Sequence, residues 1–429
     1  MDNWGDISAS AIVPLSDDST NIAESAIGSP ASESDMAKSG FDVSGMPYLT
    51  VSNNPTAGQY SDIQEAINAL QNSRYEGIYI MNGTYTLSAP IYIPDVNMHI
   101  SGESQGGVII ENNAGDEAFY INGYTSNFSI SNMTIDSQNV AAYSNLIYEV
   151  AGSGTIRASN ISINCVDAGG VGTNGDYGIY SYNSSSRVIC SNITVDSGKY
   201  GIAVVASANT QEEATIINFV GTGQTTRSLY ISSAEKGFIS NATITDVYDY
   251  GIYVAGADSM QIIGCHISGN NSARTGIYAT GSYAVIADND IDITKTNTDA
   301  SQVIALYAYQ LTESVINGNT ININIDAAAN SYGILLYTSC NDCVVTSNIV
   351  TLDNANGGAF TDYLLAVITT SDRNIINNNN LDGVTNAGSI GIYLAPGCDN
   401  NQGTSNITYR VATSVTDFGA GNTVTAKDV

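Results

Sequence analysis

Basic residues are scarce in this chain. It has 12 Lys and Arg against 41 Asp and Glu in 429 residues, and its formal net charge is −29. Proteins that bind nucleic acids neutralise phosphates with clustered Lys and Arg, and attachment to an anionic membrane surface needs the same charge. The composition therefore argues against nucleic acid and against an anionic membrane as partners.

Cysteine and histidine are also rare. The six cysteines are scattered, and the histidines are His99 and His266. This excludes a small disulfide scaffold, and the single C-x-x-C at Cys340 and Cys343 lacks the second ligand pair that a zinc site needs. We expect the thiols to be buried as small apolar groups, and we expect no resident cofactor. With so few histidines, no Ser–His–Asp arrangement can be recognised.

Long apolar runs are missing as well. The longest are too short to cross a bilayer, so no membrane insertion is expected. The first residues have neither the basic nor the apolar stretch of a secretory signal. Two explanations stay open: a leader has been removed, or the protein reaches its site without one, as a viral structural protein assembled inside its host would.

A short signature recurs through the chain. It is a small residue followed by Asn and then by alternating residues that end in Ile, Val or Leu. From Asn132 to Asn406 it recurs over ten intervals, which average about 27 residues. Clear copies stand at Asn132, Asn160, Asn192, Asn241, Asn319, Asn348 and Asn406, and weaker copies at Asn218, Gly264, Asn289 and Asn379.

A second signature, Gly-Ile-Tyr, runs in phase with the first. It reads Gly251-Ile252-Tyr253 and Gly276-Ile277-Tyr278, for example, with variants such as Ala305-Leu306-Tyr307. Two motifs that hold one period indicate a solenoid, in which short period-2 strands pair with the coils above and below. Asn and Gly would supply the left-handed corners between these strands.

Residues 60–70 show helical rather than strand spacing. Ile63, Ala66, Ile67 and Leu70 fall on one face, and Ser61 is placed to be the N-cap. We expect this helix to cover the open end of the solenoid core.

The helix, the segment GTYTLSAPIYIP at 83–94, the segment HISGESQGGVII at 99–110 and the later Gly-Ile-Tyr coils resemble the pectate-lyase-like right-handed parallel β-helix superfamily. The resemblance covers about residues 47–410. It implies an all-β fold, a right-handed parallel β-helix of about 11–12 coils with an N-terminal capping α-helix. One such scaffold hosts lyases, hydrolases and binding proteins, so it does not decide function.

The two ends differ from the repeats. Residues 1–46 are rich in Ser, Asp and Ala without periodicity, and we predict an N-terminal arm or anchor there. Residues 411–429 are predicted to be a C-terminal cap or tail, which could close the last coil and end in a short tail. This leaves no room for the large C-terminal domain of many tailspikes.

Tyrosine is the informative aromatic residue, with 27 copies against seven Phe and one Trp. If the Ile of Gly-Ile-Tyr points inward, the Tyr points outward. These tyrosines are our candidate residues for binding a glycan or a protein partner, since Tyr offers broad, rigid and amphipathic contact area. The alternative is that they stack on one another or pack against sister chains in a trimer. The candidates are Tyr180, Tyr230, Tyr253, Tyr278, Tyr307 and Tyr393, with Tyr182 and Tyr309 two residues further along.

Catalytic patterns are weak. Asp288, Asp290 and Asp292 would share one face of an extended strand and are the candidate ligands for Ca²⁺, the ion that lyases of this fold use. Asn297-Thr298-Asp299 matches one motif of the polygalacturonases by letters, but their three other motifs are missing. Inverting glycosidases need only two carboxylates about 6.5–9.5 Å apart, so a hydrolase stays an alternative.

These observations favour a non-enzymatic virion surface protein, similar to a tailspike, fibre or turret. Residues 1–46 would bind other virion proteins, and the β-helix would contact a host-surface glycan or glycoprotein, as a homotrimer by analogy with tailspikes. The alternatives are a polysaccharide lyase or hydrolase, and an adhesin or cell-envelope protein of a salt-loving microbe.

Overall fold

The computed structural model describes residues 48–56, 58–71, 77–113, 117–123, 126–137, 145–150, 154–165, 177–182, 187–206, 211–270, 273–295, 302–325, 330–354, 361–384 and 388–429. The chain divides into two units, Met1–Pro47 and Tyr48–Val429. All described residues belong to the second unit, so the predicted arm at 1–46 lies outside them.

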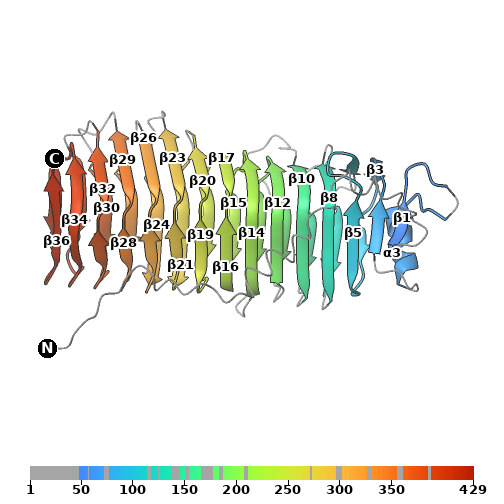
Figure 1. Ribbon diagram of the computed structural model, residues 1–429, viewed down its shortest axis with the longest axis horizontal. Helices are drawn as coiled ribbons and strands as arrows, with labels where there is room; N and C mark the ends of the chain where they lie inside the picture. Colours follow the sequence, from blue (N-terminus) through green and yellow to red (C-terminus); the bar gives the residue numbers. More distant parts are fainter. Residues whose placement is uncertain are drawn as a thin grey trace, which may run out of the picture. The chain divides into compact units, whose positions relative to one another are not determined.

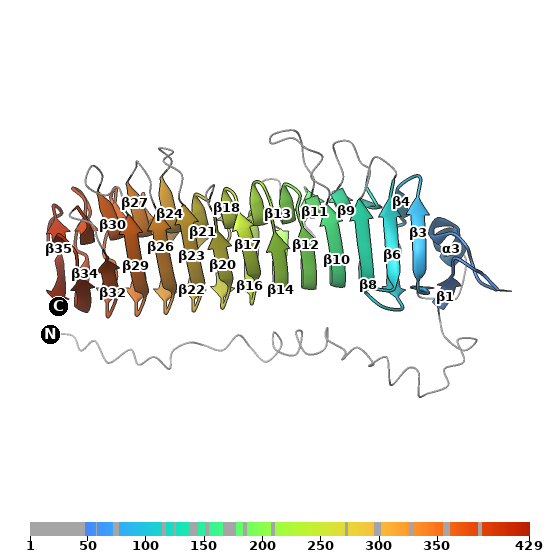
Figure 2. The same ribbon diagram turned by 90° about the horizontal axis from the view of Figure 1, so that it is seen from above.

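Two parallel sheets make up the second unit, and strands of successive coils lie side by side along it (Figures 1 and 2). Period-2 segments rich in Ile, Val, Thr and Tyr form these strands, because a parallel ladder satisfies the backbone while one face of each strand is buried. The 13-stranded sheet contains β4 (Ile91–Ile93), β7 (Phe119–Asn122), β9 (Asn145–Val150), β11 (Tyr177–Tyr182), β13 (Tyr200–Val205), β15 (Arg227–Ser232), β18 (Tyr250–Ala255), β21 (Thr275–Ser282), β24 (Val303–Thr312), β27 (Ser331–Tyr337), β30 (Asp362–Ile368), β33 (Ile390–Leu394) and β35 (Thr413–Asp417).

The 23-stranded sheet bends into two arms. Its members are β1 (Tyr48–Val51), β2 (Gly77–Ile80), β3 (Gly83–Leu87), β5 (Met98–Gly102), β6 (Val108–Asn112), β8 (Asn127–Ser137), β10 (Thr155–Cys165), β12 (Arg187–Asp196), β14 (Gln211–Thr222), β16 (Ala234–Ser240), β17 (Thr243–Val247), β19 (Met260–Ile263), β20 (His266–Gly269), β22 (Val285–Ala287), β23 (Asp290–Lys295), β25 (Val315–Asn317), β26 (Thr320–Ile325), β28 (Val344–Thr346), β29 (Ile349–Asn354), β31 (Ile375–Asn377), β32 (Asn380–Gly383), β34 (Gln402–Tyr409) and β36 (Thr423–Asp428). The predicted parallel β-helix is therefore confirmed.

The predicted helix is present as α3 (Ile63–Leu70), and it buries the four apolar residues of the predicted face. It contacts β1, β2 and β4 at the N-terminal end of the solenoid (Figure 1). The N-cap is Asp62 rather than Ser61: the backbone N–H of Glu65 donates to Asp62 Oδ1 over 2.8 Å. Both residue types are good caps, and only the position at which helical dihedrals begin decides between them.

Two kinds of corner join the two parts of the 23-stranded sheet, and the sequence repeat alone did not distinguish them. In the early coils the signature Asn is itself the left-handed residue, as at Asn160 and Asn192 with φ of 52° and 53°. In the later coils the left-handed residue comes one position earlier, for example Gly318 with φ of 67°, and the Asn after it is buried. There Asn319 Nδ2 donates to Ile286 O and to Asn348 Oδ1, both over 2.9 Å.

The interior of the solenoid is one continuous hydrophobic cluster dominated by Ile. All six cysteines are buried and free of disulfides, as predicted. Burial raises the pKa of the Cys343 thiol to about 12, so this thiol is inert at neutral pH.

Residues 411–429 do not form a separate tail. Strand β35 pairs with β33, and β36 pairs with β34, so the solenoid continues past residue 410 almost to the end of the sequence. Val415, Val424 and Ala426 pack against the main core. The alternating pattern of these short segments is too brief to be distinguished from a turn without the coil on which they stack.

Candidate binding face

The predicted tyrosines lie in one register column on the outer surface of the 13-stranded sheet. Tyr230, Tyr253, Tyr278 and Tyr307 face one another in four consecutive coils. Tyr180 and Tyr393 belong to the same column, and Ala203, Leu335 and Ala366 occupy the levels between them. We call the outer surface of this sheet from β11 to β33 the tyrosine face.

A second column of tyrosines stands beside the first, and periodicity did not predict it. It contains Tyr177, Tyr200, Tyr250, Tyr332 and Tyr363. In β18 the burial pattern places two consecutive buried residues between Tyr250 and Tyr253, so residues three apart share the outer face. The signal was present as a Tyr directly before a Gly at 177, 200, 250 and 332.

The glycine of Gly-Ile-Tyr explains this departure from alternation. A Cβ on Gly276 would lie 2.6 Å from Ile291 Cγ2 and 2.7 Å from the carbonyl oxygen of Ala305. The strand therefore runs too close to the next coil and to the opposite wall for a side chain. This close approach is what turns the residue before the glycine outward.

The rings on the tyrosine face contact one another. Tyr253 and Tyr278 are stacked with centroids 4.4 Å apart and an interplanar angle of 9°, and Tyr177 and Tyr200 stack at 4.4 Å and 2°. Tyr309 and Tyr337 add a third column. Burial raises the pKa of Tyr307 and of Tyr332 to about 12, and neighbouring phenols add to each rise.

Arg227 takes the place of a tyrosine in the second column. Its guanidinium carbon lies 3.8 Å from the ring centre of Tyr253 and 4.3 Å from that of Tyr230. These are cation–π distances, and they hold a positive charge within the aromatic surface. Its Nε has no hydrogen-bond partner among the described residues.

A short row of charges borders the second column. Arg274 Nε lies 3.8 Å from Asp249 Oδ1, and the two residues directly precede β21 and β18 of successive coils. Burial raises the pKa of the Asp249 carboxyl, and Arg274 and Arg227 partly offset this rise. Lys199 lies with its Nζ 5.7 Å from the ring centre of Tyr200.

Carboxylates are nearly excluded from the tyrosine face. From β4 to β33 the strands of the 13-stranded sheet contain two, Glu149 and Asp362, and both are buried. The 23-stranded sheet instead exposes Asp196, Asp246, Asp290 and others on its outer surface. A protein of strongly negative net charge therefore has one face without exposed strand carboxylates.

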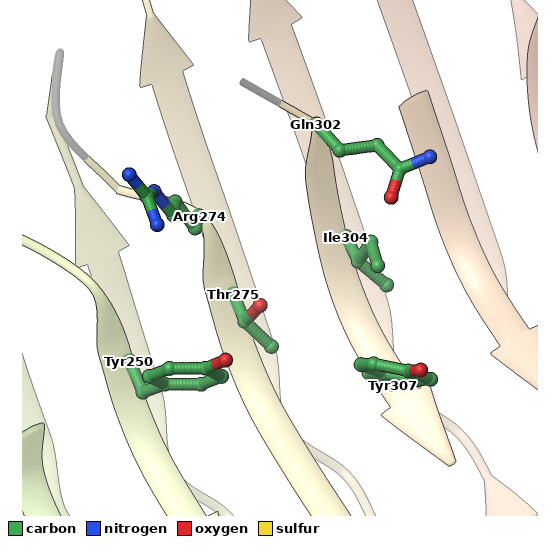
Figure 3. Close-up of a pocket in the computed structure, with 6 residues that line it drawn as sticks. All are labelled: Tyr250, Arg274, Thr275, Gln302, Ile304 and Tyr307. Atoms are coloured by element: carbon green, nitrogen blue, oxygen red, sulfur yellow. The ribbon is translucent and has the colours of Figure 1, made fainter. Parts of the chain in front are cut away.

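An open pocket of about 340 Å³ interrupts the second column, as Figure 3 shows. Its floor is Thr275 and Ile304, which occupy the two levels between Tyr250 and Tyr332. Tyr250 and Tyr307 stand on its two sides, and Arg274 and Gln302 lie at its upper rim (Figure 3).

The candidate calcium ligands are placed apart from this face. Asp290 and Asp292 lie on the outer surface of β23, and Asp290 pairs with His266 over 2.9 Å. Asp288 is not on that strand, because it is the left-handed corner residue, with φ of 55°. The expectation that all three share one strand face is therefore wrong. No group of three or more His, Cys, Asp or Glu able to hold a metal occurs within the described ranges. Asn297, Thr298 and Asp299 lie outside them.

No helix in the described part of the chain is long and apolar enough to span a membrane. No curated protein matches the sequence.

Solved structures with a similar backbone have diverse functions. The A-module of the mannuronan C-5 epimerase AlgE6 of Azotobacter vinelandii is 13% identical, with 86% of this chain and 94% of that chain covered and a TM-score of 0.46. The surface adhesin PfbA of Streptococcus pneumoniae is 13% identical, with 82% and 87% covered and a TM-score of 0.48. The Dettilon tailspike protein is 12% identical, with 87% and 68% covered and a TM-score of 0.43. These likenesses are too distant to transfer a ligand or an activity.

Two family models match adjoining parts of the chain. The right-handed β-helix region matches residues 206–381, and the pectate-lyase-like family of rhamnogalacturonase A and epimerases matches residues 57–223. Together with the coils, the corners and the capping helix, they assign this chain to the pectate-lyase-like right-handed parallel β-helix superfamily.

Proposed function

We propose that this protein is a non-enzymatic surface protein that holds a host-surface glycan or glycoprotein on its tyrosine face. The observation that supports this most is the pair of tyrosine columns with stacked rings. Stacked rings lose little side-chain entropy on binding, and their faces suit the C–H surfaces of sugars while their hydroxyls donate and accept hydrogen bonds.

The setting we propose is the surface of a virus particle, with residues 1–46 bound to other virion proteins and the solenoid as part of a homotrimer. An extracellular or cell-surface protein of a microbe is the alternative setting. Deletion of residues 1–46 should abolish incorporation into particles while the solenoid still folds. Light scattering on the intact chain should give three times its 44.9 kDa mass.

Binding is tested on a panel of host-surface glycans. The double variant Tyr253→Ala/Tyr278→Ala removes the stacked pair at the centre of the face and should weaken binding at least tenfold, which is about 1.4 kcal/mol. The matched control is Tyr409→Ala, because Tyr409 lies on β34 of the other sheet. Equal binding by the double variant and the control would contradict the proposal.

A polysaccharide lyase or hydrolase is the second candidate, because one matching family model is named for rhamnogalacturonase A and epimerases and is pectate-lyase-like. A hydrolase needs two carboxylates at the substrate, and the strand carboxylates of the 13-stranded sheet from β4 to β33 are buried. The two catalytic carboxylates would then have to come from another part of the chain. Release of reducing ends or unsaturated products from polysaccharides, measured with and without chelator, would establish this alternative.

A further inference from the structure

The pocket exists because two adjacent coils break the second tyrosine column. Tyr250 and Tyr332 stand at its two ends, and Thr275 and Ile304 replace the rings between them. Neighbouring parallel strands are about 4.8 Å apart, so three coil steps separate the two tyrosines by roughly 14 Å. A volume of about 340 Å³ is near the lower end for small-ligand sites, about 300–1,000 Å³. The pocket thus fits one or two sugar units rather than a long chain.

The charges beside this pocket are unusual for the molecule. Arg274 lines it with its side chain 60% exposed, and the Arg227 guanidinium is held two coils away in the same band of the face. Both belong to a chain with only 12 basic residues. The nearby carboxylate is Asp249, whose side chain is 27% exposed.

We propose that this pocket binds a single sugar that bears an anionic substituent, a carboxylate or a sulfate. The inference rests on the proposed glycan-binding function and names the class of sugar. Arg274 binds the anionic group, since a guanidinium offers paired N–H donors that match the two oxygens of a carboxylate or sulfate. Tyr307 and Tyr250 pack against the sugar ring, and Gln302 is placed for its hydroxyls.

The charge of Asp249 limits the affinity of this site for an anion. Its Oδ1 lies 3.8 Å from Arg274 Nε, beyond hydrogen-bond distance, and has no hydrogen-bond partner among the described residues. The carboxylate attracts the guanidinium without engaging it, and it repels an incoming anion. Removing its charge while keeping its shape should therefore tighten anion binding.

The experiment uses the full chain and three matched oligosaccharides, which end in galactose, in galacturonic acid or in 6-sulfogalactose. Affinities are measured by titration calorimetry at low and at high salt. Wild type should prefer one or both anionic sugars over galactose at least tenfold, and salt should reduce that preference. The two anionic sugars decide between carboxylate and sulfate.

Five variants locate the effect. Arg274→Gln should remove the preference for the anion, whereas Arg373→Gln should leave it within twofold, because Arg373 is a similarly exposed arginine that does not line the pocket. Thr275→Tyr should restore the column and close the pocket, with a tenfold loss, whereas Thr351→Tyr on β29 should not. Asp249→Asn, in addition, should tighten anion binding several-fold.

Three results would overturn the inference. If wild type binds galactose as tightly as the anionic sugars, or if Arg274→Gln keeps the preference, the pocket does not recognise an anion. Where that binding still depends on Tyr253 and Tyr278, the proposed glycan-binding function stands and only this inference fails. If no saccharide of this set or of the wider panel binds wild type, both fail.

Discussion

The outer surfaces of the two sheets are built from strands of the same coils with the same stacking, yet their compositions are opposite. The 23-stranded sheet exposes Asp, Asn and Thr, for example Asp292, Thr294 and Asn324 along β23 and β26. The 13-stranded sheet shows Tyr177, Tyr253 and their neighbours, and its strand carboxylates from β4 to β33 are buried. A charged and polar surface favours solubility, whereas aromatic residues such as these tyrosines are enriched in binding sites.

A solenoid can therefore carry residues that favour solubility on one face and residues that favour binding on another. Each coil contributes to both surfaces, so a residue type that recurs at one position becomes a stripe along the whole molecule. The tyrosine stripe even has a small apolar cluster of its own outside the main core. That cluster consists of Ile304, Tyr332, Leu335 and Ala366.

The largest expected effect is a dependence of stability on pH, because the two surfaces carry groups that titrate at different pH. The carboxyl groups of the 23-stranded sheet titrate at acidic pH, whereas burial raises the pKa of the phenols on the tyrosine face, to about 12 for Tyr307 and Tyr332. A raised folded pKa stabilises the fold below the unfolded value of about 10, and this stability is lost as pH rises through the folded pKa. The chain should therefore lose stability between about pH 10 and 12.

Ultraviolet absorbance of tyrosinate and circular dichroism, followed together, check this. The face tyrosines should titrate late and in the same range in which the strands unfold. A protein that ionises these phenols near their ordinary pKa while still folded would contradict the comparison.

A medium effect is expected from removing one ring. Tyr332 is 7% exposed and stacks on Tyr363 with centroids 5.0 Å apart. Tyr332→Ala should lower the free energy of unfolding by roughly 2–3 kcal/mol, since it leaves a cavity in the outer cluster and breaks a ring pair. The matched change on the other surface is Asn324→Ala on β26, which should stay within about 0.5 kcal/mol. Urea denaturation measures both, and equal effects would show that the tyrosine face adds nothing to stability.

The smallest effect belongs to the acidic surface. Asp292→Asn on β23 removes one of two exposed carboxylates two residues apart on that strand. The variant should be more stable than wild type by about 0.3 kcal/mol at low salt, and the difference should vanish at high salt as charges are screened. A gain that persists in high salt would point to a cause other than repulsion.

Much of the fold could be predicted from local rules that the repeats restate. A left-handed Asn or Gly at a regular interval sets each corner, and alternation then assigns Ile252 to the core and Tyr253 to the surface. The tyrosine column followed for the same reason, because coils of one period stack in register. The capping helix was predictable from its apolar face, although the choice of Asp62 over Ser61 as N-cap was not.

The finer features depend on neighbours far away in the sequence. Tyr250 turns outward because Gly251 lies against Ile267 and the next coil, a contact that no local pattern contains. Asp288 left its strand face because the corner in the later coils moved by one residue.

The sequence by itself determined a right-handed parallel β-helix with a tyrosine-bearing outer face, because the repeat encodes strand, corner and facing in every coil. The tertiary structure alone decided the pocket. Thr275 and Ile304 are 29 residues apart, and only the register of β21 with β24 places them side by side between Tyr250 and Tyr332. Stacking of the coils brings Thr275 and Ile304 together as a gap in the tyrosine column, and Arg274 beside this gap completes the proposed site.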